Sequence, residues 1–100
     1  MKTKTITLTS NQMETIIDFL EWFKKEYDPQ DRDCQFVMNR LTEKYEMSKQ
    51  PDHNPSCLDI HDTEIWFLRN YLQSAWQDDS CTVESKALHE LYDFIVENDK

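Results

Sequence analysis

The chain has 100 residues, of which 20 are acidic and 11 are basic, so its formal net charge is −9, and it contains no glycine. Without glycine, the chain cannot form the glycine-rich loops that bind nucleotide phosphates or the glycine-flanked serine of α/β-hydrolases. The negative charge disfavours direct binding of nucleic acid, whose phosphates attract Lys and Arg. At this length we expect a single domain, residues 1–100, that folds without a metal or a disulfide.

The cysteines and the hydropathy pattern indicate the cellular compartment. Three cysteines, at positions 34, 57 and 81, are an odd number and show no C-x-x-C spacing. This is typical of reduced thiols and not of a disulfide framework. The N-terminal residues lack the apolar run of a signal peptide, and no segment approaches ~20 consecutive apolar residues. We therefore expect a soluble, cytoplasmic protein.

The first half of the chain predicts one strand and two helices. Residues 5–8 alternate apolar and polar side chains, as a short strand does. Thr9 and Gln12 have the spacing of a capping box and predict a helix over residues 10–27. Asp28 and Pro29 end this helix and predict a second one over residues 30–47, since proline is favoured at the first helical position. The apolar positions of the two helices are Met13, Ile16, Ile17, Leu20 and Phe23, then Cys34, Val37, Met38, Leu41 and Tyr45.

The second half follows a linker and has the same order of elements. Residues 48–57 contain two of the three prolines and no periodicity, which indicates a linker. A strand is predicted over residues 58–60, where it can pair with the first strand. Helices are predicted over residues 62–77, capped by His61 or Asp62, and over residues 83–98. The turn and cap between them are assigned to Asp78, Asp79, Ser80 and Thr82, and the last apolar line is Ala87, Leu88, Leu91 and Ile95.

The two halves share an apolar pattern. Residues 6–23 match residues 58–75 at an offset of 52, and the second helices match at an offset of 50. This indicates two strand-helix-helix units, residues 1–47 and 58–100, which arise by internal duplication or only by the common periodicity of core-facing helices. The expected fold is mainly α, with two helical hairpins forming a four-helix bundle and a short two-stranded ribbon joining them.

One group of residues could bind a metal. His53, Cys57 and His61 recur at four-residue intervals, and Cys81 or His89 could complete a zinc shell. An intervening proline prevents a helix from aligning the first two, and no standard zinc spacing is present. No cysteine motif or glycine oxyanion loop supports a thiol nucleophile either. A small metal-dependent or thiol enzyme is therefore the alternative, and we expect no metal, no cofactor and no enzymatic activity.

Charge is unevenly distributed along the chain. Residues 1–50 contain nine acidic and eight basic side chains, a net charge of −1, whereas residues 51–100 contain eleven and three, a net charge of −8. A surface of spaced carboxylates can mimic nucleic acid and occupy the basic groove of a partner. Some small acidic helical proteins of phages and mobile elements, including anti-CRISPR and anti-restriction inhibitors, have this general character. That is a likeness of type and composition, without a sequence match to any family.

We therefore expect a non-enzymatic protein that inhibits or regulates a basic, nucleic-acid-handling protein partner by occlusion. The candidate partner-binding residues are acidic residues of the second half and two aromatic residues: Asp62, Glu64, Asp78, Asp79, Glu84, Glu90, Asp93, Glu97, Trp66 and Phe67. Trp66 and Phe67 correspond to polar residues of the first unit, so they either fill the seam between the hairpins or form a contact surface. In the second case, a structural homodimer that closes on these two rings is a further alternative.

Two carboxylate stripes are predicted on outer helix faces: Glu14, Asp18 and Glu21, and Glu90, Asp93 and Glu97. Both stripes are interpreted as solvated faces, with an acidic contact surface as the alternative, because catalytic carboxylates need a concave, partly desolvated pocket. Glu97 and Asp99 also stand at the end of the last helix, where negative charge opposes the helix macrodipole. Either a frayed terminus or a functional role would explain their position.

Overall fold

The computed structural model describes residues 4–27, 30–52 and 55–99. Within these ranges the elements are β1 (Thr5–Thr7), α1 (Ser10–Tyr27), α2 (Arg32–Ser48), the 3-10 helix η1 (Pro55–Leu58), β2 (Asp59–His61), α3 (Asp62–Trp76) and α4 (Ser85–Asn98). The protein is mainly helical, with four α-helices and a two-stranded antiparallel sheet in the described ranges. The predicted fold class is therefore confirmed.

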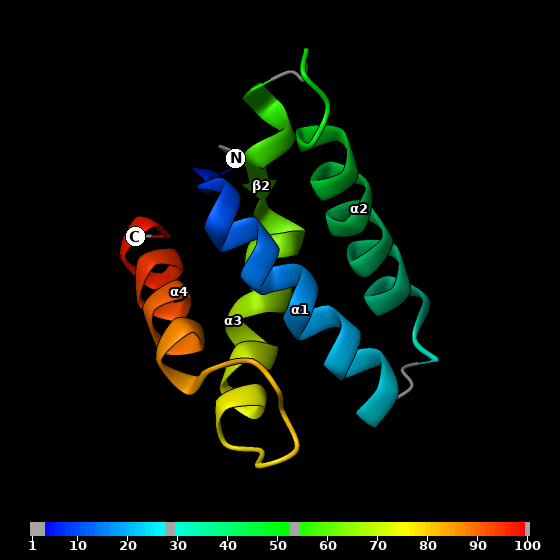
Figure 1. Cartoon of the computed structure of the whole chain (residues 1–100), viewed down its shortest axis with the longest axis vertical. Helices are drawn as coiled ribbons and strands as arrows, with labels where there is room; N and C mark the ends of the chain where they lie inside the picture. Colours follow the sequence, from blue (N-terminus) through cyan, green and yellow to red (C-terminus); the bar gives the residue numbers. More distant parts are fainter. Residues whose placement is uncertain (1–3, 28–29, 53–54, 100) are drawn as a thin grey trace.

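Helices α1 and α3 form the centre of the bundle, and α2 and α4 lie on opposite sides of them (Figure 1). The two central helices each have six buried residues, whereas α2 has four and α4 has three. All four helices and both strands contribute to one hydrophobic cluster. The central helices therefore supply most of the core, and the outer two cover its flanks.

The burial of the helices follows the predicted 3.6-residue periodicity. Three of the matched pairs of α1 and α3 are at most 2% exposed, and two of the matched pairs of α2 and α4 are at most 3% exposed. These positions are Met13, Ile16 and Leu20 with Ile65, Leu68 and Leu72, and Met38 and Leu41 with Leu88 and Leu91. The two hairpins thus use equivalent positions for their cores, while internal duplication stays a prediction.

The two strands pair with Ile6 opposite Ile60, and both side chains are buried. The pairing continues beyond the strands, because the Leu8 N–H donates to the Leu58 carbonyl at 2.9 Å. The second strand was therefore predicted one residue too early, at residues 58–60, and the first strand, predicted over residues 5–8, was one residue too long. The reason is the register, which places Ile60, and not Leu58, at the centre of β2.

The capping box at the start of α1 is confirmed. The Thr9 N–H donates to Gln12 Oε1 at 2.8 Å, and the Gln12 N–H donates to Thr9 Oγ1 at 3.1 Å. The start of α2 differs from its prediction, because Asp31 is the N-cap and accepts a hydrogen bond from the Asp33 N–H at 2.9 Å. Helix α2 therefore begins at Arg32 and not at residue 30. The predicted cap residues, 28 and 29, lie outside the described residues.

The segment between α3 and α4 also differs from its prediction. Helix α4 begins at Ser85 with Glu84 as its N-cap, two residues later than predicted. Asp78 accepts hydrogen bonds from the Ser80 N–H at 2.9 Å and from the Ser80 hydroxyl at 2.8 Å. Asp78 therefore closes a local turn and does not cap the helix, which leaves a longer loop before α4. In the predicted linker, η1 packs against α2.

Candidate functional site

The structure places most of the predicted partner-binding residues on the surface. Six of the acidic residues and Trp66 are exposed, and Asp78 is half-buried in its turn. The six are Asp62, Asp79, Glu84, Glu90, Asp93 and Glu97. Glu64 and Phe67 are only 2% and 1% exposed, so neither is on the surface.

Glu64 belongs to a buried polar network and not to an acidic surface. Its carboxylate accepts two hydrogen bonds from Lys44 Nζ, at 2.9 and 2.7 Å, and one from the His61 N–H at 3.3 Å. Lys44 Nζ also donates to the Asp59 carbonyl at 2.7 Å. Lys44 thus links α2 to β2 and α3, and its charge compensates the burial of Glu64.

Phe67 fills the seam between the two hairpins, which was the first of the two roles predicted for Trp66 and Phe67. Its ring lies 5.8 Å from Phe23 and 6.5 Å from Phe19 of α1, in edge-to-face arrangements. Trp66 points the other way and is 59% exposed. The two neighbouring aromatic residues therefore have different roles, because adjacent positions of a helix lie about 100° apart.

Acidic side chains line two separate hollows along α1, one beside α4 and one beside the loop that precedes α4, and we call the two together the α1–α4 groove. The first has a volume of about 160 Å³ and is lined by Asn11, Gln12, Thr15, Ala87, Glu90 and Leu91. The second, of about 230 Å³, is lined by Asp18, Glu21, Trp22, Lys25, Glu26, Ser80, Thr82 and Val83. These described lining residues include four carboxylates and one cation, Lys25. The groove thus combines acidic residues from both halves of the chain.

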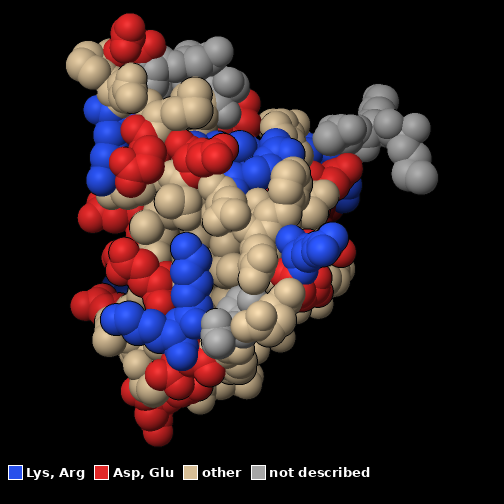
Figure 2. Space-filling model, turned by 90° about the vertical axis from the view of Figure 1, so that its right-hand side faces the viewer, with Lys and Arg blue, Asp and Glu red and all other residues tan. Residues whose placement is uncertain are grey.

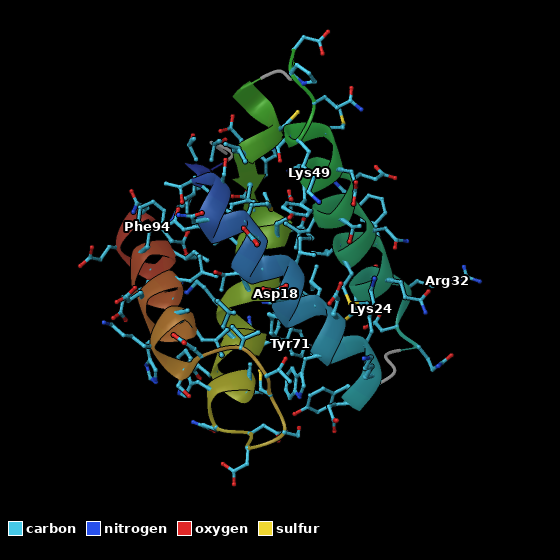
Figure 3. All side chains as sticks on the ribbon, viewed as in Figure 1. Asp18, Lys24, Arg32, Lys49, Tyr71 and Phe94 are labelled. Carbon is cyan, nitrogen blue, oxygen red and sulfur yellow. The ribbon has the colours of Figure 1, made fainter. Side chains whose placement is uncertain are left out.

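The three residues of the first carboxylate stripe, Glu14, Asp18 and Glu21, are all exposed, which agrees with their interpretation as a solvated face. Asp18 lies on the outer side of α1 (Figure 3), and Asp18 and Glu21 are exposed and line the groove. Glu14 is close enough to Lys49 at the end of α2 to contribute to the raised pKa of that lysine, for which the hydrogen bond to Tyr45 is the main cause. The sequence offered an acidic contact surface only as the alternative for Asp18 and Glu21, because helix periodicity does not reveal which element lies beside a stripe.

The second hollow has an ordered wall. Trp22 is buried, and its Nε1–H donates to Ser80 Oγ at 3.0 Å. Ser80 in turn is held by Asp78, and the hydrogen bonds from the Ser80 backbone and hydroxyl lower the pKa of Asp78. The loop before α4 is thereby attached to α1, which gives this part of the groove a defined shape.

The face that includes α2 has a different charge pattern. In Figure 2, Lys and Arg side chains are interspersed with Asp and Glu around an uncharged central area. Arg40 lies over the Phe36 ring, 5.5 Å from its centroid, and Phe36 is 57% exposed. This face therefore carries charges of both signs close to one another.

Asp99 connects α4 to the rest of the fold. It forms an ion pair with Lys4 at 3.2 Å and a second one with Arg69 of α3, and only 12% of its side chain is exposed. Burial raises the pKa of Asp99, but the hydrogen bonds from Lys4 and Arg69 outweigh this effect and lower the pKa below its usual value. A partner for this carboxylate, and not a frayed terminus, explains its position at the end of α4.

The residues of the alternative enzyme hypothesis are dispersed in the part of the chain that the structure describes. Cys34 and Cys57 are buried, Cys81 is half-buried, and none of the three forms a disulfide. His61 lies 3.1 Å from the Thr5 hydroxyl. His53 lies outside the described residues, and the described ones contain no group of three His, Cys, Asp or Glu that could hold a metal ion.

None of the helices in the described ranges is both long and apolar enough to cross a membrane. Comparison of the chain with protein-family models, with curated protein sequences and with solved structures found no match.

Proposed function

We propose that this protein is a non-enzymatic inhibitor or regulator that occludes the basic surface of a nucleic-acid-handling protein, and that the α1–α4 groove is its contact site. One observation supports this proposal above the others. Asp18 and Glu21 of α1 line one hollow of the groove and Glu90 of α4 lines the other, so carboxylates that are distant in the sequence line two hollows beside α1. Carboxylates in such an array can replace phosphates as ligands of Lys and Arg side chains.

The exposure of these carboxylates favours binding over catalysis. Asp18, Glu21 and Glu90 are all exposed to solvent. A carboxyl group that acts as a general acid near neutral pH needs burial or a close like charge to raise its pKa. Exposed carboxylates contribute instead to the rate and the specificity of association with a basic partner.

The partner class follows from the charge and the size of the site. A chain with a net charge of −9 associates fastest with a positively charged surface, and such surfaces are typical of proteins that bind DNA or RNA. A nuclease or DNA-binding protein of a defence system, inhibited by a phage or a mobile element, is one setting in which occlusion suffices for function. In this mechanism the nucleic acid and the acidic protein compete for one basic groove.

The test compares two variants with the same net charge. The groove variant carries Asp18→Lys, Glu21→Lys and Glu90→Lys, and the control variant carries Glu43→Lys, Glu46→Lys and Asp52→Lys, which replace exposed residues elsewhere. Each variant changes the charge by three times +2, from −9 to −3. The tagged proteins are used to capture partners from lysate at low and at high salt, and each captured protein is then assayed for duplex binding in competition with the untagged protein.

We expect the wild-type protein to retain a basic partner at low salt, to release it at high salt and to displace nucleic acid from it. The groove variant should lose at least about tenfold in affinity, because several charge pairs are reversed at once, and the control variant should lose much less. Equal losses in both variants would show that only the net charge matters. A captured partner whose duplex binding is unaffected would contradict occlusion.

A further inference from the structure

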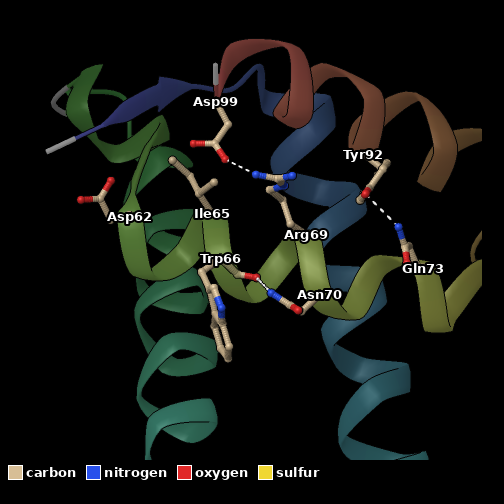
Figure 4. Close-up of a pocket in the computed structure, with 8 residues that line it drawn as sticks. All are labelled: Asp62, Ile65, Trp66, Arg69, Asn70, Gln73, Tyr92 and Asp99. Carbon is tan, nitrogen blue, oxygen red and sulfur yellow. Dashed lines mark hydrogen bonds and ion pairs between the residues drawn. The ribbon is translucent and has the colours of Figure 1, made fainter.

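The outer face of α3 presents an exposed tryptophan, and the polar side chains around it contact Lys4, Tyr92 and Asp99 at the edges of this face. Asp62, Trp66, Arg69, Asn70 and Gln73 are all exposed along this helix. Trp66, at 59%, is the most exposed of the large hydrophobic residues in the described ranges. A hollow of about 360 Å³ lies beside it, between α3 and the end of α4 (Figure 4). An exposed ring next to a hollow is a typical anchor for a protein contact.

We propose that a second copy of the chain binds this face, with the two α3 helices antiparallel and the two Trp66 rings at the twofold axis. This inference does not depend on the proposed function, because it concerns the opposite side of α3 from its contact with α1. The contact surface consists of Asp62, Trp66, Arg69, Asn70 and Gln73, and we call it the α3 face.

The α3 face is complementary to itself. Asp62 precedes Trp66 by four residues and Asn70 follows it by four, so all three lie on one side of the helix. A twofold axis at Trp66 therefore places Asp62 of each copy beside Asn70 of the other copy, with Arg69 adjacent. The Asp62 carboxylate thus faces an amide twice in one isologous contact, as twofold symmetry requires, while Arg69 stays paired with Asp99 of its own chain.

Charge also favours a second copy on this face. Two chains with a net charge of −9 repel one another, so they can associate only where carboxylates are few or paired. On the α3 face, Arg69 already binds Asp99, which Lys4 binds as well. A smaller hollow on the side toward α2 is lined by Asp62 and Thr63 together with Phe36 and Arg40, which adds a second exposed ring and a second cation to its border.

The α1–α4 groove stays accessible in such a dimer. Helix α1 lies on the other side of α3 in the bundle (Figure 1), so the dimer would present two grooves that face away from the contact. Two grooves in one assembly allow a dimeric or repetitive partner to be bound more tightly than one groove would bind it.

The first test is sedimentation velocity of the full chain over a range of concentrations. We expect the wild-type protein to dimerise reversibly at micromolar concentrations and Trp66→Ser to weaken the dimer at least tenfold. Met47→Ser is the matched control, because Met47 is 54% exposed on α2, outside the α3 face, and its removal should leave the dimer unchanged. A wild-type protein that is monomeric at about 200 µM would overturn the proposal.

A second pair of variants tests the antiparallel register at one exposed position. Asn70→Lys places a cation beside Asp62 of the other copy twice per dimer, and Asn70→Glu places a carboxylate there. We expect the dimer dissociation constant to fall about fivefold in Asn70→Lys and to rise about fivefold in Asn70→Glu, since each exposed charge pair contributes modestly. Far-UV circular dichroism confirms that both variants fold. Shifts of the dissociation constant in the same direction, or no shift in either variant, would overturn the proposed register.

Discussion

Lys44 of α2 and Glu64 of α3 form an ion pair inside the protein, with Nζ 2.7 Å from Oε2 and side chains that are 15% and 2% exposed. The pair links the two hairpins, since α2 belongs to the first unit and α3 to the second. Hydrogen bonds from the His61 N–H to Glu64 and from Lys44 to the Asp59 carbonyl complete the network. The network therefore couples the packing of the helices to the position of β2.

Replacing Lys44 should strongly destabilise the fold. The substitution Lys44→Met keeps the apolar stem but leaves the Glu64 carboxylate buried without its cation, which costs about 3 to 5 kcal/mol. Urea denaturation followed by tryptophan fluorescence measures the free energy of unfolding. In the double variant Lys44→Met, Glu64→Leu we expect much of that loss to be recovered, because no charge is then buried. A loss below about 1 kcal/mol in the single variant would mean that Glu64 is solvated.

The Asp99 ion pairs should make stability dependent on pH. Because the folded-state pKa of Asp99 is lowered, its contribution is present above the unfolded-state pKa and is lost as the pH falls through the folded-state pKa. We expect Asp99→Asn to lose about 0.5 to 1.5 kcal/mol at pH 7 and the difference from wild type to shrink below about pH 4. The matched control is Glu97→Gln, which replaces an exposed carboxylate two residues earlier, and this variant should be as stable as wild type. A difference for Asp99→Asn that persists at low pH would contradict the lowered pKa.

The capping box of α1 should contribute measurably to stability. Thr9→Ala removes the hydroxyl that accepts the Gln12 N–H, and we expect a loss of about 0.5 to 2 kcal/mol in the free energy of unfolding. Thr9→Ser keeps the hydroxyl and serves as the control, with a loss below about 0.5 kcal/mol. Equal losses in the two variants would assign the effect to the threonine methyl group and not to the cap.

The three cysteines should differ in their reactivity toward a thiol reagent. Cys34 and Cys57 are 6% and 4% exposed, whereas Cys81 is half-buried in the loop before α4. In the native protein we expect Cys81 to react first and the other two to react at the rate of unfolding, because access to the thiol limits the reaction. Peptide mapping by mass spectrometry after a short pulse of iodoacetamide identifies the modified residue. Early modification of Cys57 would contradict its burial.

Local signals in the sequence predicted most of the helical structure. The pair Thr9 and Gln12 marks the start of α1, and the predicted extent of that helix agrees with the structure. The predicted start of α2 was wrong, because the sequence contains three aspartates that could each cap the helix, Asp28, Asp31 and Asp33. Only the backbone geometry of the folded chain selects Asp31, whose carboxylate reaches the Asp33 N–H.

The candidate site was less predictable than the fold. The sequence identified Glu90, Asp93 and Glu97 as one exposed stripe, and the structure places all three on the surface. It also suggested Glu64 as a surface residue, and nothing in its local pattern distinguishes it from Asp62, two residues earlier. The difference arises from Lys44, which is 20 residues away in the sequence and compensates the burial of Glu64 alone.

By itself, the sequence determined the helices, their buried faces and the net charge, because periodicity and capping depend on residues within one or two turns. Only the tertiary structure decided which acidic side chains are buried, paired or gathered in a groove. Glu64 and Asp99 have cations from other elements beside them, whereas Asp18 and Glu90 line two hollows along α1 that form only when the chain folds. The free energy of a carboxylate depends on charges and solvent within a few ångströms, and in this protein those charges come from distant parts of the chain.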